Sequence, residues 1–159
     1  MKESQKSNML FATAEAMLAK YPLHVTATPN ASLLCLSSKP LSEEAQAAVA
    51  ASAERLGYGS SNVAWVAVAP EAEMEACTLP LTENDIRTIV EGIDPVAVVV
   101  TDSNAAAMMA EAYKQPLFCD HPCRVAGRSV APFTNFEALL ATPDSKQKAW
   151  TLLKELALG

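Results

Sequence analysis

The stretch Pro95-Val96-Ala97-Val98-Val99-Val100-Thr101-Asp102-Ser103-Asn104 decides the fold class of this chain. Residues 96–100 are apolar at every position, which is typical of a central strand that is covered on both faces of a parallel sheet. Asp102-Ser103-Asn104 follows directly and provides a helix cap for an Ala/Met-rich helix that ends near Tyr113. A buried strand that leads straight into a capped helix predicts a parallel sheet with helices on its faces.

The same strand-then-helix pattern occurs twice before this stretch. Residues 32–36 form an apolar strand, and Ser42-Glu43-Glu44 then opens an Ala-rich helix that Gly57 ends. A second apolar strand covers residues 63–68. After it, Thr82-Glu83-Asn84-Asp85 predicts a capping box, and the helix behind it has one apolar face made of Ile86, Ile89, Val90 and Ile93.

The remaining segments complete the pattern. We expect an amphipathic helix over residues 8–20, a loop or short edge strand over 23–30, and one or two short strands over 124–132. Thr142-Pro143 predicts the start of a last helix that carries Trp150. Strands that alternate with helices in this order predict one α/β domain over residues 1–159, a three-layer α/β/α arrangement with a mostly parallel central sheet.

Composition limits the classes of partner. The chain has 159 residues and a formal net charge of −6, which argues against strong DNA binding because nucleic-acid-binding domains usually carry a basic surface. The longest apolar strand is far shorter than the roughly 18 residues of a membrane span, and the N-terminus does not resemble a secretory signal. We therefore expect a cytoplasmic protein with reduced cysteines and no membrane association.

Several segments, taken in order, match the pattern of one known family. They are residues 53–58 with 62–68, 75–81, 86–100, 102–106, 124–132 and 139–153. For example, Arg124-Val125-Ala126-Gly127-Arg128-Ser129-Val130-Ala131-Pro132 is similar to the family's "v..gr.V.pt". Together they resemble the uracil-DNA glycosylases of the iron–sulfur type over roughly residues 32–157. The resemblance implies the glycosylase core fold and a pocket that receives a flipped base.

The chain departs from this family where the family's chemistry lies. Ser37-Ser38-Lys39-Pro40-Leu41 stands where the water-activating "GE.PG" loop is expected, Ala67 replaces an asparagine that pairs with uracil, and Asn135-Phe136-Glu137 replaces "HPS". Of the cluster cysteines only Cys77 matches, so the resemblance does not provide an iron–sulfur site. We therefore predict no catalytic residue, no metal and no cofactor.

The candidate ligand pocket lies at the carboxyl end of the predicted sheet, where open α/β folds bind ligands. The predicted site residues are Ser37, Ser38, Phe133, Asn135 and Phe136. The two phenylalanines have two interpretations: they stack on a base, or they close a pocket that has lost its function. We favour closure.

One other cluster and three single residues are weaker candidates. Cys119, His121 and Cys123 offer two thiolates and an imidazole to zinc, but no second ligand pair is close in the sequence, so a loop with free thiols is expected. His24 is interpreted as a surface or packing residue, and Trp65 and Trp150 as packing residues.

The sequence thus predicts a uracil-DNA glycosylase-like protein without glycosylase activity, which acts as a binding or interaction protein for a small ligand or a protein partner. The alternative is an atypical glycosylase or nucleotide-processing hydrolase, with a carboxylate or hydroxyl that faces Asn135 across an open cleft. A third hypothesis is a plain α/β scaffold that forms a homodimer through the Ala/Met-rich helix.

Overall fold

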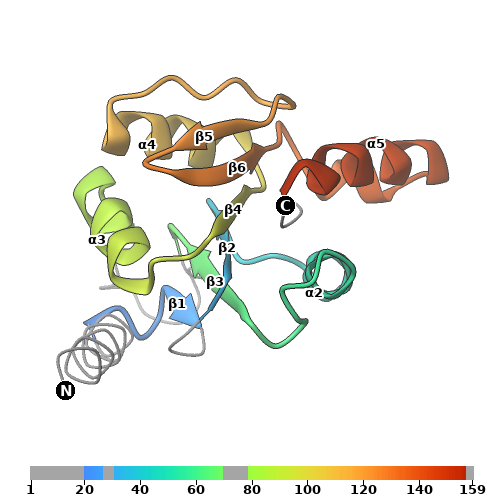
Figure 1. The fold of residues 1–159 in the computed structure, drawn as a ribbon. Coiled ribbons are helices and arrows are strands. Elements are labelled where there is room, and N and C mark those ends of the chain that lie inside the picture. The colour runs from blue at the N-terminus through green and yellow to red at the C-terminus, as the bar shows by residue number, and fades with distance from the viewer. Residues whose placement is uncertain (1–19, 27–30, 70–78, 157–159) are drawn as a thin grey trace, which may run out of the picture.

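The structure, a computed structural model, describes residues 20–26, 31–69 and 79–156 (Figure 1). The helix expected over residues 8–20 and the cysteine at position 77 lie outside the described residues, apart from Lys20 at the helix end. Among the described residues, no helix is long and apolar enough to cross a membrane.

The described strands form one six-stranded mixed sheet in the order β1-β3-β2-β4-β6-β5. Their bounds are β1 Val25–Thr26, β2 Leu33–Ser37, β3 Val63–Ala67, β4 Ala97–Val100, β5 Cys123–Val125 and β6 Arg128–Pro132. The four inner strands β3, β2, β4 and β6 are parallel, whereas β1 and β5 pair antiparallel at the two edges. The predicted parallel centre is confirmed, and the segment over 124–132 forms the β5–β6 hairpin.

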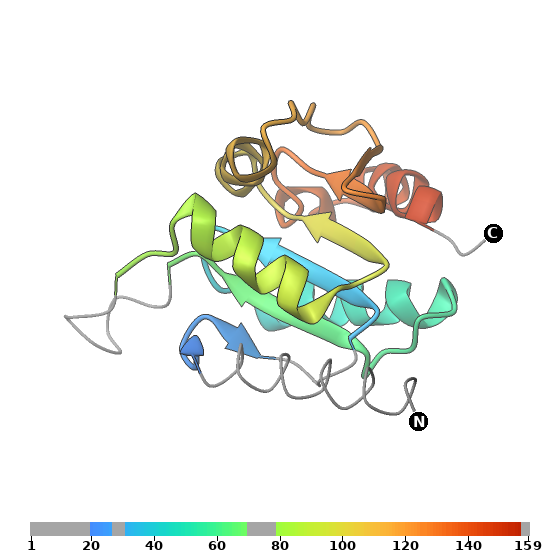
Figure 2. The same ribbon diagram turned by 60° about the vertical axis from the view of Figure 1, so that its left-hand side comes forward.

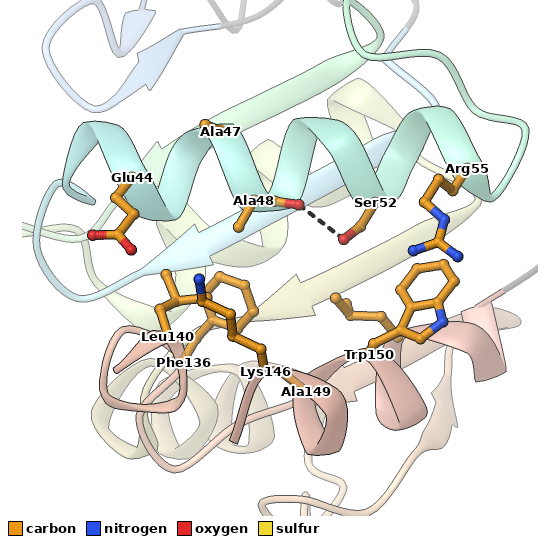
Figure 3. A pocket seen from close by; sticks show the side chains of 11 residues that line it. Glu44, Ala47, Ala48, Ser52, Arg55, Phe136, Leu140, Lys146, Ala149 and Trp150 are labelled. Carbon is orange, nitrogen blue, oxygen red and sulfur yellow. Dashed lines mark hydrogen bonds between the residues drawn. The ribbon is translucent and has the colours of Figure 1, made fainter. Parts of the chain in front are cut away.

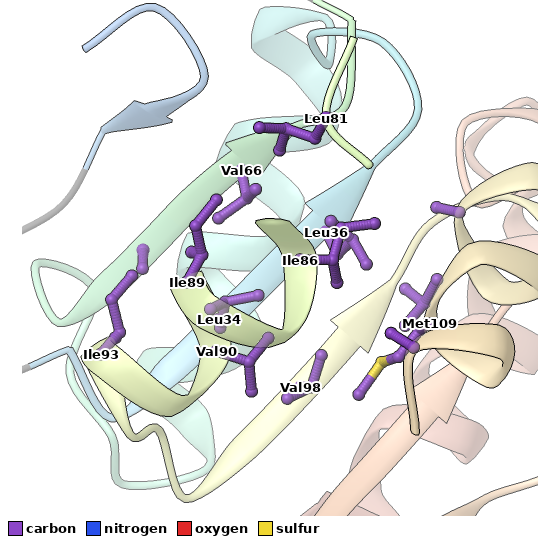
Figure 4. Packing of buried hydrophobic residues seen from close by; sticks show 14 of the residues in the cluster. Leu34, Leu36, Val66, Leu81, Ile86, Ile89, Val90, Ile93, Val98 and Met109 are labelled. Carbon is purple, nitrogen blue, oxygen red and sulfur yellow. The ribbon is translucent and has the colours of Figure 1, made fainter. Parts of the chain in front are cut away.

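Helices cover both faces of the sheet (Figure 2). Residues that alternate along β2 divide between two cores: Leu34 and Leu36 pack toward α3 (Glu83–Ile93) and α4 (Ser103–Tyr113), as Figure 4 shows. Leu33 and Cys35 instead pack toward α2 (Glu43–Arg55) and α5 (Pro143–Leu153). This alternation follows from the two-residue period of a strand, and the result is a mixed α/β fold.

All four predicted helix starts are confirmed by their caps. The side chains of Ser42, Thr82, Asp102 and Thr142 accept a hydrogen bond from the backbone N–H three residues later. The capping box of Thr82 is complete, because the Asp85 carboxylate accepts from the Thr82 N–H in return. Four local sequence signals therefore define where the helices over the sheet begin.

Strand β4 is central, as its apolar sequence predicts. Ala97–Val100 are fully buried between β2 and β6, but Val96 is 51% exposed and precedes the strand. The pairing of β2 with β4 begins at Ala97. The Val96 backbone still bonds to Ser32 and Ser129, whereas its side chain projects into solvent. The expectation of a buried strand over residues 96–100 is therefore wrong by one residue.

A buried arginine ties β6 to the turn between α3 and β4. Arg128 Nε donates to the Pro95 carbonyl at 3.1 Å, and its guanidinium also bonds to Glu91 (3.2 and 3.3 Å) and to Asp94 (2.7 Å). Burial opposes ionisation of Glu91, but hydrogen bonds from Arg128 and Tyr113 outweigh it and hold the pKa of Glu91 below its usual range.

Substituting Arg128→Met should lower the free energy of unfolding by about 1–3 kcal/mol at neutral pH, since the buried Pro95 carbonyl loses its donor. Because the pKa of folded Glu91 is depressed, its stabilisation is complete above the unfolded pKa and is lost as pH falls through the folded pKa. Urea unfolding should therefore give a smaller difference between the two proteins at low pH than at neutral pH.

The matched control is Lys114→Met, which removes an exposed cation from its ion pair with Glu111. It should change stability very little, because solvent screens such exposed pairs. An equal effect of Arg128→Met at neutral and acid pH would contradict the role assigned to Glu91.

Candidate functional site

The carboxyl ends of β2 and β4 are where a ligand crevice is expected in this topology. The chain leaves β2 through α2 toward β3 on one side, and leaves β4 through α4 toward β6 on the other. Neighbouring connections that diverge in this way define the switch point at which open α/β sheets bind ligands. Ser37 ends β2 and Ser38 follows it, and Thr101 and Asp102 follow β4.

The polar groups at this point bond to one another. The Thr101 hydroxyl donates to Ser37 Oγ at 2.8 Å, and both side chains are buried. Asp102 Oδ2 accepts from the Ser38 backbone N–H at 2.8 Å, while its Oδ1 accepts from the Ala105 N–H at 2.8 Å. Asp102 therefore caps α4 and at the same time fixes the loop that follows β2.

A small pocket of about 130 Å³ lies beside Ser37, between β1, the ends of β2 and β3, and the start of α2. It is lined by Leu23, His24, Thr26, Cys35, Ser37, Pro40, Leu41, Gln46, Trp65, Val66 and Ala67. Two of the polar side chains already have partners within the protein. His24 Nε2 is 2.9 Å from the Leu79 carbonyl, and Gln46 Nε2 donates to the Leu41 carbonyl at 3.1 Å.

The thiol in this pocket is poorly suited to nucleophilic chemistry. Burial raises the pKa of Cys35 to about 12. With this pKa, Cys35 remains an uncharged thiol at neutral pH. Because the thiolate is the form that acts as nucleophile or metal ligand, Cys35 is unsuited to either role.

Positions that the glycosylase resemblance assigned to separate motifs meet in this pocket. Ser37, Pro40 and Leu41 belong to the segment that stands for the water-activating loop, and Ala67 stands for the base-pairing asparagine. None of these four side chains has a carboxylate or an amide. At these positions the wall can offer one hydroxyl and hydrocarbon contacts.

The two predicted pocket aromatics are core residues. Phe133 and Phe136 are each 1% exposed and pack edge-to-face with ring centroids 5.1 Å apart. Both belong to the core under α2 and α5. Neither ring is free to stack on a base in this arrangement.

Asn135 lies between these two aromatics in the sequence but is exposed. Its Oδ1 accepts from the Ala138 N–H at 3.1 Å, and its backbone bridges to Asp102. Ser38 and Asn135 thus both adjoin Asp102, whereas of the five predicted site residues Ser37 alone is among those that line the pocket.

The segment with Cys119, His121 and Cys123 makes a structural turn. Asp120 has a positive φ of 67°, and its carboxylate accepts from the Thr134 hydroxyl at 2.8 Å. Cys119 and Cys123 are free thiols. Within the described ranges, no three His, Cys, Asp or Glu side chains gather in a way that would hold a metal ion.

Sequence reasoning missed the second contact of Asp102 and the part played by Thr101. The register supplied a signal, because Leu36 pairs with Val100 and the polar residues Ser37 and Thr101 come next on adjacent parallel strands. Sequence reasoning also interpreted His24 as a surface or packing residue and did not place it in the pocket that it lines.

Comparison of the chain with models of protein families and with curated proteins finds no match.

Proposed function

We propose that this chain is a divergent uracil-DNA glycosylase-like domain, with that family's three-layer α/β/α arrangement, which lacks glycosylase activity and acts as a binding protein. The observation that carries the proposal is the lining of the pocket beside Ser37. Residues from two sequence-distant motifs of the resemblance, Ser37 and Ala67, line one cavity. That convergence supports a common architecture, and the residue types there support a loss of its chemistry.

Base excision needs hydrogen-bonding and acid–base groups. The residues that stand at the family's motif positions in this pocket do not provide them. A glycosylase stabilises charge on the leaving base and activates water, and loss of one such donor typically costs about 10²–10³ in rate. Ala67 cannot hydrogen-bond through its side chain. The Asn135 side-chain oxygen accepts a hydrogen bond from the Ala138 backbone N–H. The nearby aromatics in the sequence, Phe133 and Phe136, are both buried.

The size of the pocket restricts its ligand. A volume of about 130 Å³ corresponds to about four water molecules at liquid density, well below the about 300–1,000 Å³ of drug-sized sites. A single small ring or a short polar molecule suits this space.

The test is an excision assay on single- and double-stranded oligonucleotides that contain one uracil. We expect no abasic sites above background, even with protein in excess over DNA, and no difference between the wild type and Asn135→Ala. Uracil excision that Asn135→Ala abolishes would overturn the proposal and support the alternative of an atypical glycosylase.

The binding part is tested separately, by thermal-shift screening of single-ring compounds against the wild type and Ala67→Phe. A ligand of this pocket should raise the Tm of the wild type but not that of Ala67→Phe, whose added ring fills the cavity. Equal shifts in both proteins would contradict binding in the pocket beside Ser37.

A further inference from the structure

A second and larger cavity lies between α2 and α5 (Figure 3). It is lined by other residues of α2 than the pocket beside Ser37. Its volume is about 390 Å³, within the about 300–1,000 Å³ typical of small-molecule sites. The lining is mainly apolar and includes Ala47 and Ala48 from α2 together with Leu140, Ala149 and Leu153. We call it the α2–α5 groove.

One end of the groove is formed by an arginine and a tryptophan. The Arg55 guanidinium of α2 lies 4.2 Å from the centroid of the Trp150 ring of α5. In Figure 3 the two side chains approach each other from opposite helices. Stacking uses the flat face of a guanidinium and leaves the N–H donors at its edge available to a ligand.

The charges of the groove differ from those of the whole chain. Arg55 and Lys146 both line it, against one carboxylate, Glu44. Within the described part of the chain, neither cation takes part in a salt bridge. A groove with net positive charge on a chain of formal charge −6 favours anions over cations.

We propose that the α2–α5 groove binds a small amphipathic organic anion, a carboxylate attached to an extended apolar body. The apolar body lies along the alanines and leucines of the groove, where it is removed from water. The carboxylate accepts hydrogen bonds from Arg55 or Lys146. The groove therefore buries the apolar body of the ligand and pairs with its carboxylate, which are two different parts of the same molecule.

A small molecule fits the groove better than a protein partner does. Specific protein interfaces bury at least about 1,000 Å² of surface and are built around large buried anchors. The α2–α5 groove offers few such anchors. Its one large aromatic side chain with exposed surface, Trp150, is already stacked on Arg55. This inference does not depend on the glycosylase resemblance.

The experiment uses dodecanoate as the probe, below its aggregation concentration. The chain has two tryptophans, so Trp65→Phe leaves Trp150 as the single reporter inside the groove. Dodecanoate should change the fluorescence of Trp150 saturably. Arg55→Gln and Lys146→Gln, made in this background, should together weaken binding about tenfold or more, and Glu44→Gln should not weaken it.

Arg87→Gln is the matched control, because Arg87 is an exposed arginine near the Tyr113 ring on the opposite face of the sheet. It should leave dodecanoate binding unchanged. Dodecanol, with the same apolar body and no charge, should bind at least about tenfold more weakly than dodecanoate.

Three results would each overturn the proposal. They are no saturable signal with dodecanoate, equal binding of dodecanoate and dodecanol, and equal binding by the Trp65→Phe protein and by the double variant made in it. Light scattering on the same samples detects a fourth: a dimer that Arg55→Gln and Lys146→Gln dissociate would mean that a second copy of the chain occupies the groove. The uracil excision assay is unaffected by these results, so the two proposals fail independently.

Discussion

Substituting Phe133→Ala should lower the free energy of unfolding by about 3–5 kcal/mol, the usual cost of deleting a buried phenylalanine ring. Phe133 is 1% exposed and packs against Phe136 at the end of β6, in the core under α2 and α5. Removal of the ring loses its burial and leaves a cavity between sheet and helices. Chemical denaturation, with the midpoint and slope fitted together, measures the change.

The chain offers a matched control for this substitution. Phe118 is 67% exposed, so Phe118→Ala should change stability by less than about 0.5 kcal/mol, as surface substitutions usually do. If Phe133→Ala cost as little stability as Phe118→Ala, Phe133 would not be a core residue. That result would also reopen the interpretation in which Phe133 stacks on a ligand.

Substituting Asp102→Ala should cost about 2–4 kcal/mol, because one carboxylate makes two separate contacts. It caps α4 through the Ala105 N–H and holds the loop after β2 through the Ser38 N–H. The loss should appear as a lower unfolding midpoint. Hydrogen exchange should also become faster at both of these amides.

Two comparisons separate the contributions. Ser42→Ala removes only a helix cap, the bond from the Ala45 N–H, and should cost about 1 kcal/mol. Asp102→Asn retains a good cap residue and should recover part of the stability that Asp102→Ala loses. If Asp102→Ala costs no more than Ser42→Ala, the bond to Ser38 contributes nothing measurable.

Local patterns predicted the elements of the fold because each pattern depends on neighbouring residues. The four caps are set within three residues of sequence, and the apolar face of α3 follows the helical period. The uniform apolar run of β4 indicated its central position before any partner was known. Its first residue was misplaced, since Val96 precedes the first paired residue of β4 and its side chain is exposed.

The candidate site was less predictable, because its contacts join distant segments. Ser38 and Asp102 are 64 residues apart, and no local pattern indicates that the serine N–H reaches the carboxylate. The pocket beside Ser37 includes His24, which directly precedes β1. The sequence predicted this segment as either a loop or a short edge strand. The Arg55–Trp150 contact joins two helices on one face of the sheet and has no sequence signature.

The edges of the sheet affect how this protein can associate. β1 pairs over two residues and β5 over three, and both run antiparallel to the parallel centre. Short edge strands offer few unpaired backbone groups to a strand from another molecule, which is a common protection against edge-to-edge aggregation. On α4, the alanines and the methionine that pack on the sheet are already buried. Among the described residues, the outer surfaces of the helices are therefore better placed for self-association than the sheet edges. A concentrated sample should form few cross-β aggregates while the fold is intact.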